Sequence, residues 1–187
     1  MLSSPVRRGT PFLAFAAGLA VGGVITAAVL VVVGSLVRAP LPDAARWGVL
    51  GGVLGAVVLR ELDVLSFTLP ENRRLVPETV LRFGRHLGPL QFGLEMGTGA
   101  RTFLPSGLPY VGAVAVLLIA SVPAAICTGA GFGLGRAMMT MSNLRYGPDN
   151  LWSDEWDRHG NRLGRMMGAA VVLPLLVLAV PTFSRWL

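Results

Sequence analysis

Four polar side chains at regular spacing form the part of this sequence that is best placed to do chemistry. Gln91, Glu95, Thr98 and Thr102 fall at positions i, i+4, i+7 and i+11 of a stretch that is otherwise apolar and rich in glycine. This spacing predicts one polar stripe along a helix. Because a carboxylate at membrane depth is costly unless it is protonated or paired, we expect Glu95 to find a cationic partner, with Arg101 and Arg136 as candidates.

Two interpretations of Glu95 stay open. In the first, its carboxylate takes up and releases protons while the stripe lines a substrate path, as proton-coupled transport requires. In the second, Glu95 and an arginine form a buried pair that only fixes how the helices pack.

The composition places these residues in a membrane protein. Of the 187 residues, 53% are hydrophobic and only 14% are charged, whereas a soluble domain has about 25% charged residues. All 16 basic residues are arginine, and the net charge is +6. The arginines flank apolar runs, which is typical of topology signals and of contact with anionic lipids, so we expect a lipid partner and no nucleic acid. The absence of lysine and the abundance of Ala, Gly, Val and Leu indicate a GC-rich bacterial source.

We expect an all-α fold, with residues 1–187 forming a single integral membrane domain, a polytopic bundle of about five helices. The expected spans are 12–37, 44–67, 88–107, 109–134 and 163–183, and the expected cytoplasmic loops are 68–87 and 136–162. The third span is short, because residues 89–104 reach only about 24 Å as a helix and the hydrocarbon core is roughly 30 Å thick. Gly93, Gly97 and Gly99 each weaken it further. A broken helix covered by the rest of the bundle is therefore expected.

The distribution of arginine favours five spans over four. With five spans, 12 arginines lie on the cytoplasmic side and 4 on the other. If residues 88–107 instead enter and return to the same side, the division is 9 against 7. The positive-inside rule then predicts a multi-pass protein of the bacterial cytoplasmic (inner) membrane with a cytoplasmic N-terminus.

Pairs of glycines four residues apart predict close helix contacts in lipid. They occur at Gly18 and Gly22 in the first span, and at Gly129/Gly133 and Gly131/Gly135 near the end of the fourth. Pro123 predicts a kink within that fourth span.

Charged and aromatic side chains outside the spans predict contacts with lipid or with a partner. The residues of this group are Arg73, Arg74, Arg82, Arg85, Trp152 and Trp156. At the end of the second span, Arg60 precedes Glu61 and Asp63, which indicates an arginine that extends to the membrane boundary beside two acids. A polar gate at the cytoplasmic mouth is the alternative there.

Catalysis is not indicated by any motif. The sequence lacks a nucleophile–base arrangement and a phosphate loop, and the glycines before Arg136 do not follow a strand. Glu155 and His159 have the spacing of metal ligands on a helix, but two ligands alone do not define a site. We therefore expect neither a metal nor another cofactor, and the chain has one cysteine, Cys127, which cannot form an internal disulfide.

One stretch resembles a known kind of protein. The run FGLEMGTGARTFLPSGLPY, followed by a long span that ends in FGLGRA, resembles small actinobacterial membrane proteins of unknown role. It is more distantly similar to the glycine- and proline-rich hairpins of the cytochrome c biogenesis and thiol-disulfide transporter family. That family works through a pair of membrane cysteines, and this chain has only Cys127. The resemblance therefore implies a shape and no redox relay.

The sequence leaves two functions open. The first is transport, by a homo-oligomer in which the polar stripe lines a path. The second is a non-catalytic accessory or scaffold subunit of a larger membrane complex, in which the glycine faces and the arginine- and tryptophan-bearing loops contact a partner subunit.

Overall fold

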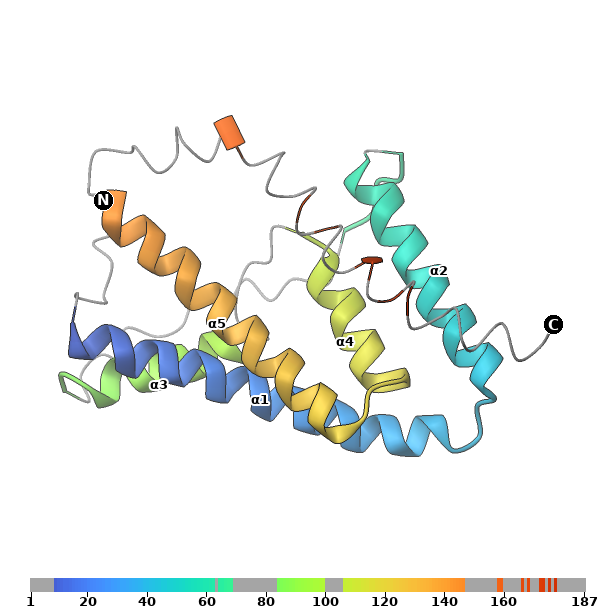
Figure 1. The fold of residues 1–187 in the computed structure, drawn as a ribbon, viewed down its shortest axis with the longest axis horizontal. Helices are drawn as coiled ribbons and strands as arrows, with labels where there is room; N and C mark the ends of the chain where they lie inside the picture. The colour runs from blue at the N-terminus through green and yellow to red at the C-terminus, as the bar shows by residue number, and fades with distance from the viewer. Residues whose placement is uncertain are drawn as a thin grey trace. The chain divides into compact units, whose positions relative to one another are not determined.

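A computed structural model describes residues 9–62, 64–68, 84–99 and 106–146, together with residues 158, 159, 166, 168, 172, 173, 175 and 177. Within these residues the fold is all α, with five helices and no strand, which confirms the predicted fold class at that level (Figure 1). The helices are α1 (Thr10–Arg38), α2 (Asp43–Glu61), α3 (Leu87–Gly97), α4 (Leu108–Leu118) and α5 (Val122–Tyr146). The chain divides into two compact units, Met1–Met141 and Ser142–Leu187.

Helix α1 is the longest of the five helices. Its 29 residues begin with Pro11 in the first turn and end with Arg38 in the last, positions that suit the free N–H groups and the free carbonyls of a helix. Among the described residues, α1 alone is long and apolar enough to cross a membrane. A signal sequence or a buried core helix meets the same two criteria.

The expected spans agree with the helices in part. The range 12–37 lies within α1, and the range 44–67 is helical only as far as Glu61. The range 88–107 is helical only to Gly97, after which Gly99 adopts a positive φ of 71°. Most of the last expected span, 163–183, lies outside the described residues, and those described within it are helical.

The expectation of one kinked helix over 109–134 is wrong. Helix α4 ends at Leu118 and α5 begins at Val122, so Pro123 stands in the first turn of a new helix. A proline inside a helix clashes with the carbonyl four residues earlier, which here belongs to Ile119. The chain avoids this clash because it turns at residues 119–121.

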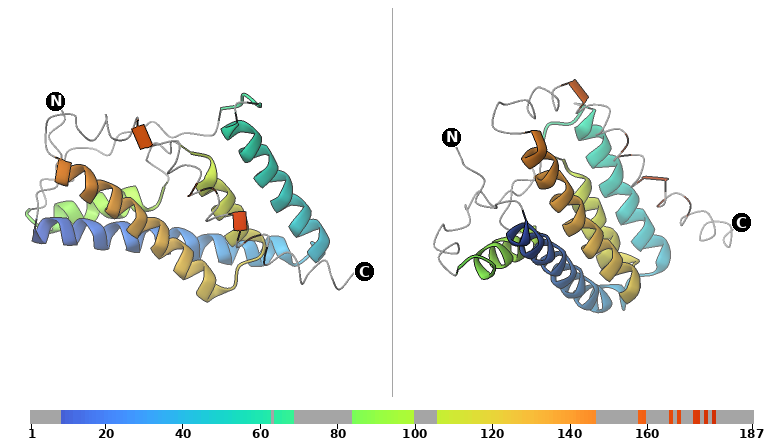
Figure 2. Two further views of the ribbon diagram at one scale, coloured as in Figure 1. Left: turned by 45° about the horizontal axis from the view of Figure 1, so that its top comes forward. Right: turned by 60° about the vertical axis from the view of Figure 1, so that its left-hand side comes forward.

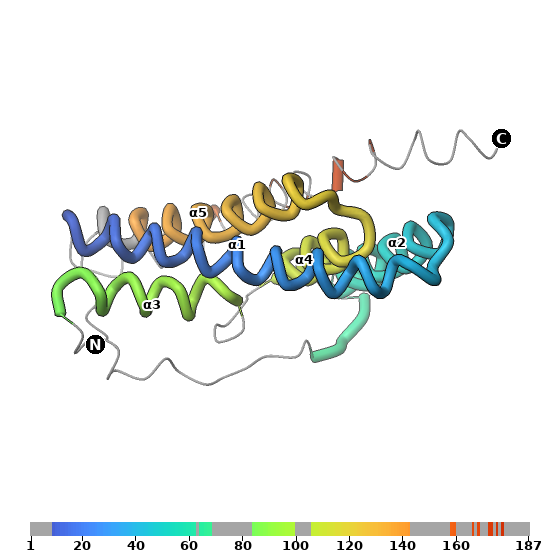
Figure 3. The backbone as a smooth tube through the Cα atoms, turned by 90° about the horizontal axis from the view of Figure 1, so that it is seen from below, coloured from blue at the N-terminus to red at the C-terminus, as the bar shows by residue number. Residues whose placement is uncertain are grey.

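Helix α1 is the centre of the first unit, and α3 and α5 lie on opposite sides of it (Figure 3). Helix α3 runs in the same direction as α1, because His86 bonds Thr10 at one end and Thr98 bonds Thr26 at the other. Helix α5 runs in the opposite direction. Its early residue Ala125 packs with Val31, and its later residue Ala137 packs with Phe15.

Glycines bring α1 and α3 into backbone contact. A Cβ atom on Gly18 would overlap the carbonyl oxygen of Leu90, and one on Gly22 would overlap that of Leu94. The contact is reciprocal, since a Cβ on Gly93 or Gly97 of α3 would meet backbone atoms of α1 in the same way. Two pairs of glycines four residues apart therefore face each other, and the predicted close packing at Gly18 and Gly22 is confirmed.

A second glycine contact joins α1 to α5. Gly23 lies against the carbonyl of Gly129, and Gly133 lies against that of Leu19. The predicted packing role of the pair Gly129/Gly133 is thus confirmed. The other predicted pair on α5, Gly131/Gly135, has open space around it within the described part of the chain.

Helices α2 and α4 lie side by side next to this core (Figure 2). They run in opposite directions, because Glu61 at the end of α2 bonds Gly107 at the start of α4. Helix α4 also touches the second half of α1, where Gly34 approaches the backbone of Leu117. Consequently α3 contacts the first half of α1, and the end of α4 contacts the second half. Residues 98–107 connect the two helices.

Candidate functional site

The predicted polar stripe lies on the last described turns of α3. Gln91 is exposed, and Glu95 and Thr98 are half-buried. Thr102, the last member of the stripe, and Arg101, a candidate partner of Glu95, lie outside the described residues. With about 100° of rotation per residue, the stripe is turned roughly two fifths of a turn away from the side of α3 that carries Gly93 and Gly97. The glycines contact α1, so the stripe lies mostly on the opposite side of α3 and is not enclosed by that contact.

Two threonines fix the end of α3 where the stripe leaves it. The hydroxyl of Thr98 donates to the carbonyl oxygen of Glu95, with an oxygen–oxygen distance of 2.7 Å. The hydroxyl of Thr26 on α1 donates to the carbonyl oxygen of Thr98 at 3.1 Å. The carbonyls at the end of a helix have no partner within that helix, and these two hydroxyls satisfy two of them. These hydrogen bonds, one of them from α1, therefore stabilise the end of α3 at this position.

Arg136, one of the expected partners of Glu95, lies on α5. Its guanidinium carbon is 5.6 Å from the centre of the Phe132 ring, one turn earlier on the same helix. An arginine stacked on an aromatic ring keeps its planar group against apolar surface.

The expected lipid or partner contacts fall mostly outside the described residues. These are Arg73, Arg74, Arg82, Trp152 and Trp156. Arg85 is described and is exposed, immediately before His86, whose ring nitrogen Nε2 lies 3.1 Å from the hydroxyl of Thr10. Within the described part of the chain no group of three metal-binding side chains occurs. Cys127 is exposed on α5.

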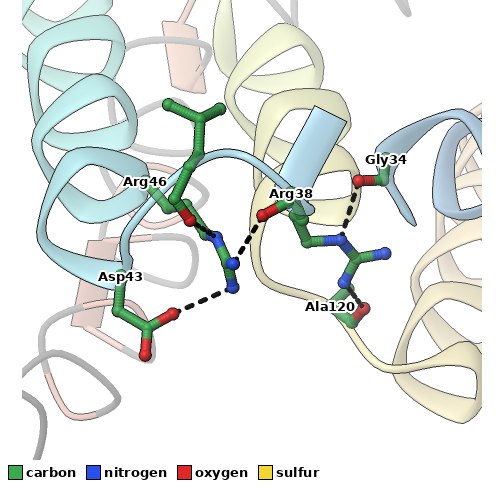
Figure 4. A network of polar contacts seen from close by, with 6 residues as sticks. Gly34, Arg38, Asp43, Arg46 and Ala120 are labelled. Atoms are coloured by element: carbon green, nitrogen blue, oxygen red, sulfur yellow. Dashed lines mark hydrogen bonds and ion pairs between the residues drawn. The ribbon is translucent and has the colours of Figure 1, made fainter. Parts of the chain in front are cut away.

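An arginine network that the sequence analysis did not find joins both helix turns at one end of the unit (Figure 4). Arg38 donates from Nη1 to the carbonyl of Ala120 at 2.7 Å, and from Nε to that of Gly34 at 3.1 Å. Its own carbonyl accepts from Nη2 of Arg46 at 2.6 Å, and Arg46 also pairs with Asp43 at 2.9 Å. The turn between α1 and α2 and the turn between α4 and α5 are thereby tied together.

The sequence does contain an indication of this network, but Arg38 and Arg46 were interpreted only as topology signals. An arginine in the last turn of a helix is placed to bond the free carbonyls there. The sequence does not reveal that one of those carbonyls belongs to residue 120, because that contact joins segments 82 residues apart.

Glu61 forms the corresponding link at the other end of α2. Its Oε1 atom accepts from the backbone N–H of Gly107 at 2.8 Å, at the start of α4. A carboxylate at a helix N-terminus interacts favourably with the unpaired N–H groups there. Nη1 of Arg60 is 3.6 Å from the same oxygen. Of the two acids expected beside Arg60, Glu61 therefore links the end of α2 to the start of α4. The other, Asp63, lies outside the described residues.

Taken together, these contacts define an all-α helical protein whose half-buried polar residues gather where α3 ends. Comparison with known proteins adds nothing to this description: no protein family, no curated protein and no solved structure matches the chain. The resemblance to small actinobacterial membrane proteins and to the thiol-disulfide transporter family stays a prediction without support from these comparisons.

Proposed function

We propose that the chain is a multi-pass protein of the bacterial cytoplasmic membrane, with its N-terminus in the cytoplasm, and that it serves transport. The proposal of a membrane location is supported by the surface of α1. Eight large apolar side chains on this helix are exposed: Leu13, Val21, Ile25, Val29, Val32, Val33, Leu36 and Val37. Of the most apolar stretch of 18 residues in α1, only a third is buried. A contiguous apolar surface of this kind is unfavourable in water and suits lipid.

The observation that carries the transport proposal is the interruption between α3 and α4. Helix α3 runs along the first half of α1, the end of α4 contacts its second half, and each of the two helices has only 11 residues. One such helix extends about 16 Å, and the hydrocarbon core is roughly 30 Å thick. We therefore assign one crossing to α3 and α4 jointly, with α5 as the returning crossing. Interrupted crossings of this type often carry the binding sites of membrane transporters.

In this arrangement Glu95 has the role of the proton-binding group. It lies two residues before the end of α3, and its backbone carbonyl accepts a hydrogen bond from the hydroxyl of Thr98. Because α1 is in backbone contact with the glycine side of α3, the path along the stripe needs a wall other than α1. The remainder of the bundle, or a second copy in a homo-oligomer, supplies that wall.

The test is proton flux into liposomes that contain the purified protein and an internal pH-sensitive dye, driven by a potassium diffusion potential. We expect the wild-type protein to carry protons, and Glu95→Gln to abolish the flux while its helical content is unchanged. The matched control is Asp43→Asn, which removes a carboxylate at the turn after α1. Equal flux through Glu95→Gln and wild type would remove Glu95 from the mechanism. A wild-type flux equal to that of empty liposomes would reject proton transport.

A second function, that of an accessory or scaffold subunit, is favoured by α2. Its glycines at positions 48, 51, 52 and 55 are all exposed, and each has open space around it within the described part of the chain. The glycines of α1 with the same spacing are in backbone contact with other helices. Native mass spectrometry of the protein extracted from its own membrane distinguishes the two functions. A complex of fixed ratio with a different polypeptide favours the subunit, and multiples of 19.7 kDa favour the homo-oligomer.

A further inference from the structure

The short segment that follows α2 exposes large apolar side chains without being helical. Leu62 and Val64 are 65% and 66% exposed, and Leu65 and Phe67 are 42% and 39% exposed. We refer to these four residues as the apolar segment. Leu59, in the last turn of α2, is 41% exposed and continues the same surface into the helix. In water this surface is unfavourable, so the segment requires a covering partner.

The backbone of the apolar segment is bonded back to α2. The N–H of Leu62 donates to the carbonyl of Val58 at 3.0 Å. The N–H groups of Val64 and Leu65 both donate to the carbonyl of Leu59, at 2.9 and 3.2 Å. Irregular backbone next to lipid is tolerated only where its polar groups have partners within the protein. Here those partners are the free carbonyls of the last turn of α2.

Arg60 completes this arrangement at the far end of the segment. Its Nε donates to the carbonyl of Phe67 at 3.1 Å, and its guanidinium carbon lies 5.8 Å from the centre of the Phe67 ring. The same side chain reaches Glu61, 3.6 Å away. An arginine that covers an aromatic ring and keeps its charge beside an acid is suited to the boundary between lipid and water.

The length of α2 sets the depth of the segment, and this step rests on the proposed membrane location. The 19 residues of α2 extend about 28 Å, slightly less than the hydrocarbon thickness of roughly 30 Å. If the turn at residues 39–42 lies at one boundary, the residues after Glu61 reach the opposite boundary. We propose that the apolar segment is a membrane-interface anchor that inserts its side chains between the lipid headgroups and the upper part of the acyl chains.

The test places a fluorescent probe on the full-length protein in lipid nanodiscs. Cys127 is first replaced by serine, and single cysteines are then introduced as Leu62→Cys and Val64→Cys and labelled with the environment-sensitive dye NBD. Two matched positions serve as controls. Val29→Cys lies on the exposed side of α1, ten residues before the turn that follows the helix, and Ala39→Cys lies in that exposed turn. Quenchers are a lipid with a nitroxide near its headgroup, a lipid with a nitroxide deep in its acyl chain, and iodide in the water.

We expect blue-shifted emission at positions 62 and 64, with a greater loss of fluorescence to the shallow nitroxide than to the deep one. Position 29 should be quenched most by the deep nitroxide, and position 39 by iodide. If NBD at positions 62 and 64 emits at the wavelength typical of a dye in water, while position 29 is still quenched by the deep nitroxide, the anchor is overturned and the membrane location stands. Probes at 62 and 64 that neither lipid nor iodide quenches would mean that protein covers the segment, which also overturns the anchor. Loss of lipid quenching at 29 as well would reject the membrane location itself.

Discussion

The contact between α1 and α3 predicts that one added methyl group at Gly22 destabilises the protein. A Cβ atom at this position would overlap the carbonyl oxygen of Leu94 and lie 3.0 Å from both the Cα and the carbonyl carbon of Gly97. Optimal carbon contacts are about 3.5–4.0 Å. All three atoms belong to the backbone, so no side-chain rotation can make room. Helix α3 must therefore move away from α1.

The size of the effect follows from comparison with Gly52→Ala on α2. Alanine is about 1 kcal/mol more favourable than glycine inside a helix, and this gain applies at both positions. At Gly52 a Cβ atom meets nothing within 4 Å, so the gain stands alone. At Gly22 the forced separation of the helices adds a cost of about 1–3 kcal/mol. For a chain of this length, a difference of about 2 kcal/mol between the two variants corresponds to about 4–8 °C in Tm.

The assay is thermal unfolding of both variants and wild type in the same detergent, followed by circular dichroism at 222 nm. We expect Gly22→Ala to melt several degrees below Gly52→Ala, and Gly52→Ala to melt at or above wild type. The reasoning is refuted if Gly22→Ala melts at the same temperature as Gly52→Ala or higher, because the backbone contact would then carry no cost.

Two further predictions concern hydrogen bonds to free carbonyls. Replacing Arg38 by methionine removes the donors to the carbonyls of Gly34, Ala120 and Val31, so we expect a loss of about 2 kcal/mol in the free energy of unfolding. Arg38→Lys should recover only part of it, because an ammonium group lacks the planar fork of donors; a methionine variant as stable as wild type would contradict this. Thr26→Val removes the hydroxyl bonded to Thr98 and should cost about 1 kcal/mol, whereas Thr26→Ser should cost less. Equal denaturation midpoints for the valine and serine variants would show that this bond does not hold α3.

The sequence predicted the glycine contacts where glycine repeats stood inside an apolar run. Gly18 and Gly22 are buried against α3, as their spacing indicated. Gly93 and Gly97 were interpreted only as residues that weaken a helix, and both are contact points on α3. The same missing side chain has both effects, because glycine lowers helix propensity and permits close approach. Which effect dominates depends on the helix opposite, and a local pattern does not reveal it.

The long-range polar contacts could not be predicted from the sequence for a related reason. Arg38 and Glu61 each have the charge that suits the helix end they occupy, but their decisive partners are residues 120 and 107. Pro123 alone indicated a distortion of the range 109–134 near residue 119, because its ring clashes with a helical carbonyl there. Whether proline bends a helix or begins a new one depends on the contacts of the turn, here the bond from Arg38 to Ala120.

The distribution of these contacts constrains any mechanism that involves movement. Helices α3 and α5 are each in backbone contact with α1 through paired glycines, so sliding either along α1 would drive backbone atoms into one another. Helix α2 buries only Leu50 and Val57 and is held mainly at its two ends. Elements with few buried contacts open at the lowest free energy. The α1–α3–α5 core is therefore the fixed part of the first unit, and α2 is the element whose displacement would expose the start of α4.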